Sequence, residues 1–315
     1  MKKLNIVFMG TPDFAVAILD KIITEQYNIV GVITAPDKPA GRGRKINQSP
    51  VKKYALEKGL KVLQPTNLKD PEFVKELKTL NANLQIIVAF RMLPKVVWDQ
   101  PELGTFNLHA SLLPDYRGAA PINWAIMNGE TKTGVTTFFL DEKIDTGAII
   151  LQKETDIAVD ETVGQLHDRL MHLGADLVIE TLKLVAEDKV VTKIQPEKVS
   201  KSAYKIHTET CRIDWNLPLD TIYNHIRGLN PYPAAWTEIE NGATKVKVKL
   251  FDCKKELAEH THASGCIITE KSSLKITTRD GYLHVNSLQL SGKRRMDTAS
   301  LLNGFKFEQG AKTTT

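Results

Sequence analysis

The first half of the chain alternates short apolar runs with segments of helical periodicity. The run 84–89, Leu-Gln-Ile-Ile-Val-Ala, is apolar at nearly every position, which is typical of a strand covered on both faces of a sheet. Two helix starts combine an N-cap residue with proline at the first helical position, Ser49-Pro50 and Asp70-Pro71. This alternation predicts an α/β fold with a doubly wound, mostly parallel, Rossmann-like sheet.

The other elements of this half follow from the same two patterns. Strands are expected at 4–9, 29–34, 61–63, 104–109, 134–140 and 148–155, and helices at 122–128 and 162–188. The first strand ends in Gly10-Thr11-Pro12 without the Gly-x-Gly-x-x-Gly fingerprint, so no dinucleotide site is inferred. The free N–H groups of this turn could receive an anion, or the turn could have no binding role.

The composition and periodicity of the sequence change after Val190. Residues 193–205 are polar and lack strong periodicity, which is typical of a linker. A helix near 219–227 and five short strands follow, at 235–239, 245–253, 265–269, 274–278 and 283–290. We therefore expect a catalytic domain over 1–190, a linker over 191–205 and a small OB-like β-barrel domain over 206–315, with 310–315 frayed.

Composition narrows the setting in which the chain works. Three cysteines cannot form a full disulfide framework, and no apolar run approaches the length of a membrane span, so a cytoplasmic protein is expected. The run 4–9 is too short for a signal-peptide core. Residues 201–315 hold 17 Lys and Arg against 12 Asp and Glu, which accounts for the whole net charge of +5. This excess favours either an anionic partner such as RNA or a slightly basic wet surface.

Candidate catalytic side chains lie at the end of a predicted strand. Because strand side chains alternate between faces, Asn107 and His109 point the same way. Pro114 and Gly118 end the extended run, and Pro121 suits the first turn of a helix. Open α/β sheets bind ligands at such strand ends. From spacing alone, the two side chains could equally satisfy each other and the loop backbone.

The stretch Asn-Leu-His-Ala-Ser-Leu-Leu-Pro at 107–114, followed by Tyr-Arg-Gly-Ala-Ala-Pro at 116–121, resembles the active-site block of the folate-dependent formyltransferases. The resemblance extends over about 1–305 and is greatest to members that act on initiator methionyl-tRNA. It implies transfer of a formyl group from 10-formyltetrahydrofolate to an amine. That chemistry needs an oxyanion donor, a proton shuttle and a dry pocket, and it needs no metal.

The resemblance also implies roles for particular residues. It makes Asp145 the third catalytic residue beside Asn107 and His109, although Asp-Thr-Gly at 145–147 is also common turn chemistry. Asn107 would donate to the oxyanion, His109 would donate there and pass a proton, and Asp145 would favour the imidazolium. Folate is expected between the loop after the strand at 84–90 and the loop 141–147. Its expected contacts are Phe90, Ser111, Leu112, Leu113, Pro114 and Asp141.

Two positions depart from the family pattern. Lys143 stands where the family commonly has glycine, and Arg91 stands where it commonly has a small residue. If the glycine position requires a positive φ, Lys143 implies a reshaped loop.

The acceptor would be recognised by cationic segments. Residues 37–45 form a Gly-rich loop with four cations, and a solvated charge run would look the same. The loop resembles the insertion with which the family grips the tRNA acceptor stem. The resemblance therefore assigns tRNA contacts to Arg42, Lys38, Arg44 and Lys45, and to Lys205 in the linker. No obligate protein partner is indicated, and a monomer is expected.

Other readings stay open at this point. Cys253, His260, His262 and Cys266 could ligate zinc, but their spacing matches no common finger and no metal site is predicted. The chain could also formylate a small amine, such as glycinamide ribonucleotide or an amino sugar nucleotide. A third reading is an RNA-binding protein without catalytic activity.

Overall fold

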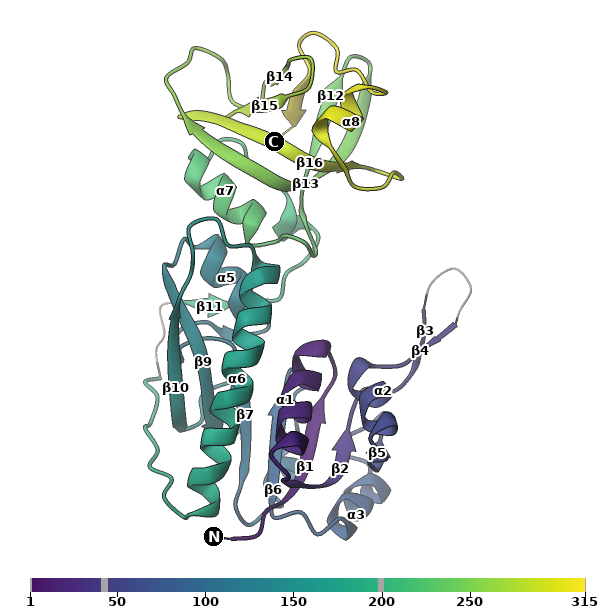
Figure 1. Cartoon of the computed structure of the whole chain (residues 1–315), viewed down its shortest axis with the longest axis vertical. Helices are drawn as coiled ribbons and strands as arrows, with labels where there is room; N and C mark the ends of the chain where they lie inside the picture. Colours follow the sequence, from purple (N-terminus) through teal and green to yellow (C-terminus); the bar gives the residue numbers. More distant parts are fainter. Residues whose placement is uncertain (1, 41–44, 198–200, 315) are drawn as a thin grey trace. The chain divides into compact units, whose positions relative to one another are not determined.

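The computed structural model describes residues 2–40, 45–197 and 201–314 of the chain (Figure 1). The contacts divide the chain into two compact units. Unit 1 comprises Met1–Gly118, Thr133–Thr155 and His167–Ser202, and unit 2 comprises Ala119–Lys132, Asp156–Leu166 and Ala203–Thr315. The domain boundaries predicted at 190 and 205 stay predictions.

Unit 1 is built on a seven-stranded sheet with the order β10-β9-β7-β6-β1-β2-β5. Its strands are β1 (Asn5–Gly10), β2 (Asn28–Ile33), β5 (Val62–Leu63), β6 (Leu84–Val88), β7 (Thr105–His109), β9 (Lys132–Phe139) and β10 (Ile149–Asp156). Neighbours from β5 through β7 run parallel, whereas β9 is antiparallel to β7. All five residues of β6 are buried, as its apolar run predicted. The doubly wound, mostly parallel sheet is confirmed.

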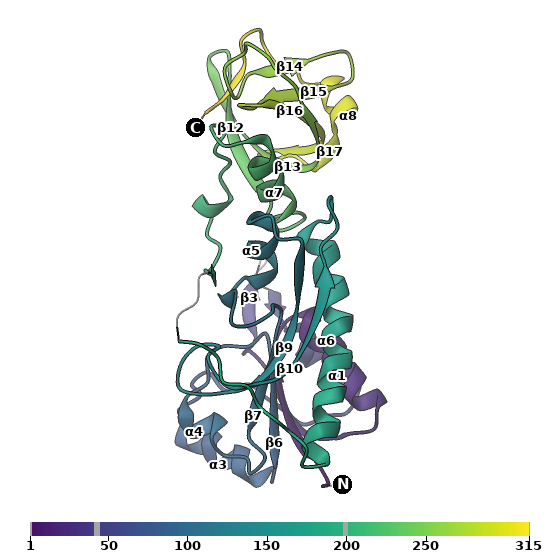
Figure 2. The same cartoon turned by 90° about the vertical axis from the view of Figure 1, so that its left-hand side faces the viewer.

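Helices cover both faces of this sheet. They are α1 (Asp13–Thr24), α2 (Pro50–Glu57), α3 (Pro71–Thr79), α4 (Lys95–Trp98) and α6 (Val163–Ala186). The helices α1 and α6 lie on one face, and α3 and α4 lie on the other (Figure 2). On the α3 and α4 side, alternate residues of β1, Val7 and Met9, join Phe73 and Val97 in one apolar cluster. The alternation of side chains along β1 therefore decides which of its residues face α3 and α4.

The predicted helix starts are confirmed by their caps. The Ser49 hydroxyl accepts a hydrogen bond from the Lys52 N–H at 3.0 Å, and the Asp70 carboxylate accepts one from Glu72 at 2.9 Å. Such caps satisfy backbone donors that have no partner inside the helix.

The segment expected as a Gly-rich loop contains two short antiparallel strands, β3 (Lys38–Ala40) and β4 (Lys45–Asn47). The expectation of a loop is therefore wrong at both of its ends. At the base of this hairpin, Asp37 accepts hydrogen bonds from Gln64 at 2.8 Å and Lys52 at 2.6 Å. These bonds hold the pKa of the Asp37 carboxyl below its ordinary value. Fixing Asp37 ties the start of the hairpin to the sheet.

Unit 2 contains a nearly closed antiparallel barrel. Its strands are β12 (Ala235–Asn241), β13 (Thr244–Leu257), β14 (Ile267–Thr269), β15 (Leu274–Thr277), β16 (Gly281–Leu290), β17 (Met296–Asp297) and β18 (Lys312–Thr314). The order is β14-β15-β16-β13-β12-β18, with β17 beside β16. A bridge between Cys266 and Lys312 brings the two ends of this order together. The predicted barrel is confirmed with two further strands.

The prediction that 310–315 is frayed is wrong for the residues described. β18 pairs with β12 through Glu238–Thr314, Ile239–Thr313 and Glu240–Lys312. Three residues are too few to show a period, so only the vacant edge of β12 identifies them as a strand.

The remaining elements of the chain are short. They are β8 (Arg117–Gly118), α5 (Pro121–Met127), β11 (Ser202–Ala203), a 3-10 turn at Glu209–Cys211, α7 (Leu219–Arg227) and α8 (Thr298–Leu302). Within unit 2, α7 packs on the barrel strands β13 and β16 and also contacts α5. Among the residues described, no helix is both long enough and apolar enough to cross a membrane.

Candidate active site

The candidate catalytic residues lie in unit 1 around the end of β7. His109 is the last residue of this strand and is buried, and Asn107 lies two positions earlier and is half-buried. Their cross-strand neighbours on β9 are Thr136 and Phe138. The period of two places Asn107 and His109 on one face, as the sequence predicted.

Asp145 comes to His109 from a loop 36 residues further along the chain. Its Oδ2 lies 3.8 Å from Nδ1 of His109, and the two side chains are 16% and 7% exposed. This separation supports a charge interaction and is too long for a hydrogen bond. The same Oδ2 accepts a hydrogen bond from the Gly118 N–H at 2.9 Å. This hydrogen bond holds the carboxylate beside the imidazole.

One imidazole nitrogen of His109 is already engaged. Nε2 lies 2.9 Å from the carbonyl oxygen of Tyr116. Because a carbonyl oxygen only accepts, Nε2 carries the proton in this hydrogen bond. The neutral ring then has its lone pair on Nδ1, which is the nitrogen that faces Asp145. Proton uptake at His109 therefore takes place on the side of Asp145.

The loop that follows β7 is held by a buried hydroxyl. Thr136 donates to the Ser111 carbonyl at 2.6 Å and accepts from the Leu113 N–H at 3.2 Å. Gln152 donates to both the Leu113 carbonyl and the Thr136 hydroxyl, at 2.8 and 3.0 Å. The Ser111 hydroxyl is fully buried and donates to the Asp115 carbonyl at 2.7 Å. Ser111 and Leu113 thus shape the loop from inside, and Leu113 packs against Phe138.

A second network, centred on Gln195, holds the loop that carries Asp145. Its amide nitrogen donates to the carbonyls of Asp145 and Gly147 at 3.0 and 2.7 Å. Its amide oxygen accepts from Nε and Nη2 of Arg117 at 3.1 and 2.7 Å. Gln195 is only 7% exposed. The sequence analysis missed this residue, which lies in a polar stretch without periodicity, and no sequence signal identified it.

The geometry of the Asp145 loop explains where this loop needs glycine. Asp145 itself has φ of 54°, in the left-handed region that side chains rarely adopt, and no positive φ is found at Lys143. Lys143 therefore needs no reshaped loop. At Gly147, a Cβ would stand 1.7 Å from the Phe139 carbonyl oxygen, so only glycine allows the strands to approach. Asp141 accepts from the Thr146 hydroxyl at 2.7 Å and from the Lys143 N–H at 3.0 Å.

The two loops expected to hold folate are neighbours in unit 1. Lys95, just after the first loop, forms an ion pair with Glu142 of the second at 3.0 Å. Each loop exposes a large apolar side chain, Met92 at 69% and Ile144 at 60%. Phe90 is half-buried, and Arg91 lies over its ring and donates to the carbonyls of Pro65 and Thr66. Adjacent loops with exposed apolar side chains suit a flat heteroaromatic ligand.

The residues expected to contact tRNA are only partly described. Arg42 and Arg44 lie outside the described residues, and the side chain of Lys45 is not described either. Lys38 and Lys205 are exposed. On β13, the three alternating lysines all have neighbours within unit 2: Lys245 pairs with Glu240, Lys247 lies over Trp236, and Lys249 donates to the Pro233 carbonyl.

Comparisons with known proteins agree with this fold. A family model described as "Formyl transferase" matches residues 2–182, and "Formyl transferase, C-terminal domain" matches residues 205–306. Among solved structures, the sugar 3N-formyl transferase WlaRD aligns with a TM-score of 0.66 and 20% identity, over 93% of this chain and 100% of that one. HypX from Aquifex aeolicus in complex with tetrahydrofolic acid aligns with a TM-score of 0.64 and 18% identity, over 96% of this chain and 47% of that one. At these identities the structures support the fold alone.

The fold and the two family matches define an enzyme of the formyl transferase class. A relative named methionyl-tRNA formyltransferase from Flavobacterium johnsoniae is 59% identical over 313 residues, 99% of each chain. A relative of the same name from Bacteroides fragilis is 55% identical over 320 residues, again 99% of each chain. The chain therefore belongs to the methionyl-tRNA formyltransferase family.

Proposed function

We propose that this enzyme transfers the formyl group of 10-formyltetrahydrofolate to the free amino group of initiator methionyl-tRNA, which gives formylmethionyl-tRNA for translation initiation. The observation that carries the proposal is the approach of Asp145 to His109 at the end of β7, 3.8 Å apart and shielded from solvent. Family membership supplies the chemistry that such a pair would serve.

Each catalytic residue has one role in this proposal, and His109 is no longer expected to donate to the oxyanion because its Nε2–H is engaged by the Tyr116 carbonyl. The amine nitrogen attacks the formyl carbon, and the Asn107 amide donates a hydrogen bond to the oxyanion that forms. His109 takes the amine proton at Nδ1, because its Nε2–H is engaged by the Tyr116 carbonyl. Asp145 stabilises the resulting imidazolium. The carbon–nitrogen bond to folate then breaks, and the same proton passes to the leaving folate nitrogen.

Folate would lie between the loop after β6 and the loop 141–147. The ion pair between Lys95 and Glu142 and the exposed side chains of Met92 and Ile144 support this choice. In this proposal the pterin takes its hydrogen bonds mainly from loop backbone. Phe90, Leu112, Pro114 and Asp141 would contact the folate. Ser111 and Leu113 would act through the shape of their loop, because both are buried.

The acceptor RNA would be bound by cations from both units. Lys38, Arg42, Arg44, Lys45 and Lys205 are the proposed contacts, with Arg42 at the end of the stem. Phosphate contacts of this kind make affinity fall steeply with salt. A cytoplasmic location, as a monomer, is part of the same proposal. The three cysteines, which form no disulfide, agree with a reducing compartment.

The small-amine alternative is not favoured. The relatives that match at 50–59% identity over nearly the whole chain are named for a tRNA substrate. Those named for sugar substrates match only at about 20% identity. A protein without catalytic activity is also not favoured, because Asp145 is positioned beside His109.

One assay tests the function directly. The enzyme is mixed with 10-formyltetrahydrofolate and initiator methionyl-tRNA, and loss of the free amine is followed. Rapid blocking of the initiator and slow blocking of elongator methionyl-tRNA are expected. Faster formylation of an amino sugar nucleotide than of the tRNA would overturn the proposal. Asn107→Ala should slow a single turnover by about 100- to 1,000-fold, the usual effect of losing one oxyanion donor.

A further inference from the structure

Unit 2 contains a pocket whose lining includes none of the catalytic residues just described. It has a volume of about 200 Å³, and its lining residues belong to α5 and the residue after it, to the segment 210–217 and to α7. All of these residues lie within unit 2. Pockets for drug-sized ligands occupy about 300–1,000 Å³, so this one suits a single ring system.

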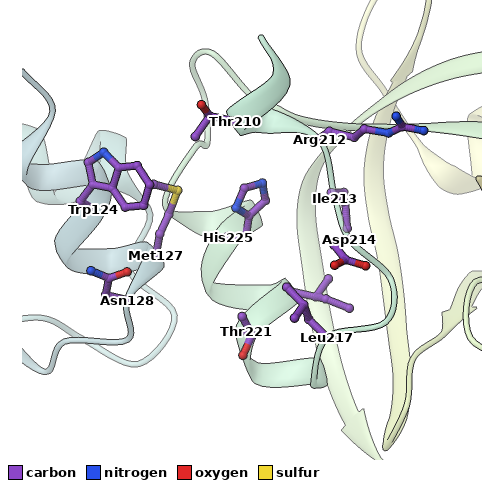
Figure 3. A pocket seen from close by; sticks show the side chains of 11 residues that line it. Trp124, Met127, Asn128, Thr210, Arg212, Ile213, Asp214, Leu217, Thr221 and His225 are labelled. Atoms are coloured by element: carbon purple, nitrogen blue, oxygen red, sulfur yellow. The ribbon is translucent and has the colours of Figure 1, made fainter. Parts of the chain in front are cut away.

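The walls of the pocket are mainly apolar and include an indole. Trp124 and Met127 reach in from α5 and face His225, which reaches in from α7 (Figure 3). Leu217 and Ile222 complete the apolar surface. A flat aromatic ring gains most from such walls, because it can stack on the indole and exclude water from the aliphatic side chains.

Polar groups at the pocket can recognise the edge of such a ring. Nε2 of His225 is buried and has no hydrogen-bond partner among the residues described. Burial lowers the pKa of His225, so the ring stays neutral at neutral pH. A buried polar atom without a partner needs an explanation, and a donor on an entering ring would supply one. The side chains of Thr210, Asp214 and Thr221 also line the pocket.

Cations gather beside one side of the pocket. The Arg212 side chain extends from the pocket towards the barrel (Figure 3), where its Cζ lies 5.5 Å from the centre of the Trp236 ring. Nζ of Lys247 lies 3.4 Å from the centre of the same ring. Trp236 is fixed by its own hydrogen bond to the Thr208 carbonyl at 2.8 Å. Two cations on one fixed ring favour an anionic group such as phosphate.

From the apolar pocket and the adjoining cations, we infer that unit 2 holds one unpaired nucleotide of the acceptor RNA, with the base between Trp124 and His225 and its phosphate at Arg212 and Lys247. The inference rests on the proposed function for the identity of the RNA. It adds a site for a single splayed nucleotide, of the kind that proteins use to recognise single-stranded RNA.

The test measures RNA binding by the whole enzyme without folate. The probe is a short single-stranded RNA, and an abasic oligomer of equal length carries the same phosphates. Leu217→Trp fills the pocket, and Leu257→Trp, on an exposed leucine of β13, is its matched control. Losing one stacked base typically weakens binding by about 5- to 100-fold. We expect that loss for the abasic oligomer and for Leu217→Trp, and unchanged binding for Leu257→Trp.

A second pair of variants tests the phosphate side. Arg212→Ala should weaken binding of both oligomers several-fold and reduce the salt dependence, whereas Lys254→Ala removes an exposed cation of β13 and should change neither. Equal binding of intact and abasic oligomers by the wild type would overturn the inference. Normal binding of intact RNA by a folded Leu217→Trp variant would also overturn it. Binding of adenosine monophosphate in the pocket without displacement of the RNA would do the same.

These outcomes separate the inference from the proposed function. Because the binding assay contains neither folate nor methionine, it does not depend on formyl transfer. If Leu217→Trp abolishes RNA binding but the wild-type enzyme does not formylate methionyl-tRNA, the nucleotide pocket is supported and the proposed function is contradicted. If the wild-type enzyme formylates methionyl-tRNA but Leu217→Trp does not change RNA binding, the proposed function is supported and the nucleotide pocket is contradicted.

Discussion

Two loops of unit 1 frame the candidate active site, and they are held in different ways. The loop at 111–114 is fixed from below by Thr136, a fully buried residue of the adjacent strand β9. The loop at 141–147 exposes its first four residues and is held by Gln195, 50 positions beyond Asp145. The first loop belongs to the core, whereas the second is a surface turn whose last residues are held by the Gln195 amide.

Because of this difference, we expect changes in the first loop to lower stability and changes in the second loop to lower the catalytic rate. Removing a buried hydrogen-bond partner from the first loop leaves polar groups with neither a protein partner nor water, so it should lower the free energy of unfolding. Removing the Gln195 amide takes both donors from the loop that carries Asp145, so it should displace Asp145. Small displacements of a catalytic group lower rate more than stability.

The largest expected effect comes from Asp145 itself. Asp145→Asn keeps an oxygen for the Gly118 N–H but removes the charge that stabilises protonated His109. Single-turnover formylation should fall by about 100- to 10,000-fold, the range for losing acid–base catalysis. Asp188→Asn, at an exposed carboxylate of unit 1 outside both loops, is the control and should stay within about twofold. A wild-type rate for Asp145→Asn would remove this carboxylate from the mechanism.

Gln195→Ala should have the next largest effect. It removes both donors to the Asp145 loop, so kcat should fall by about 10- to 100-fold while KM for both substrates stays nearly constant. Gln195→Glu should not rescue the rate, because a carboxylate cannot donate to the two carbonyls.

A double mutant shows whether Gln195 acts through Asp145. If it does, adding Gln195→Ala to Asp145→Asn should cost little beyond the single change. Fully additive losses would mean that Gln195 has a separate role.

Thr136→Val tests the other loop and should act mainly on stability. It leaves the Ser111 carbonyl and the Leu113 N–H buried without their partner. The free energy of unfolding in urea should fall by about 2–6 kcal/mol, since each of these two groups costs about 1–3 kcal/mol. The kcat of the folded variant should change less than that of Gln195→Ala. A rate loss larger than for Gln195→Ala would invert the comparison of the two loops.

Lys143→Gly should have the smallest effect. Lys143 is exposed and has no positive φ, so glycine relieves no strain there and only adds chain flexibility. Formylation rates within about threefold of the wild type are expected. A marked gain in rate would mean that the Lys143 side chain obstructs the folate site.

Much of the fold could be predicted from local signals. The helix caps at Ser49 and Asp70, the buried run of β6 and the whole of α7 follow from patterns within a few residues. β18 could not be predicted, because it is a strand only by pairing with β12. The hairpin of β3 and β4 was missed for a similar reason, since glycines and charges dominate its composition.

The sequence by itself determined the layers of the sheet, the barrel and the common face of Asn107 and His109, because periodicity and capping act between neighbours in the chain. Only the tertiary structure decided that Gln195 fastens the Asp145 loop, that Tyr116 engages Nε2 of His109 and that Trp124 faces His225 across a pocket. Side chains of these residue types can contact many different partners in a folded protein. Which partner each one meets depends on how the whole chain packs.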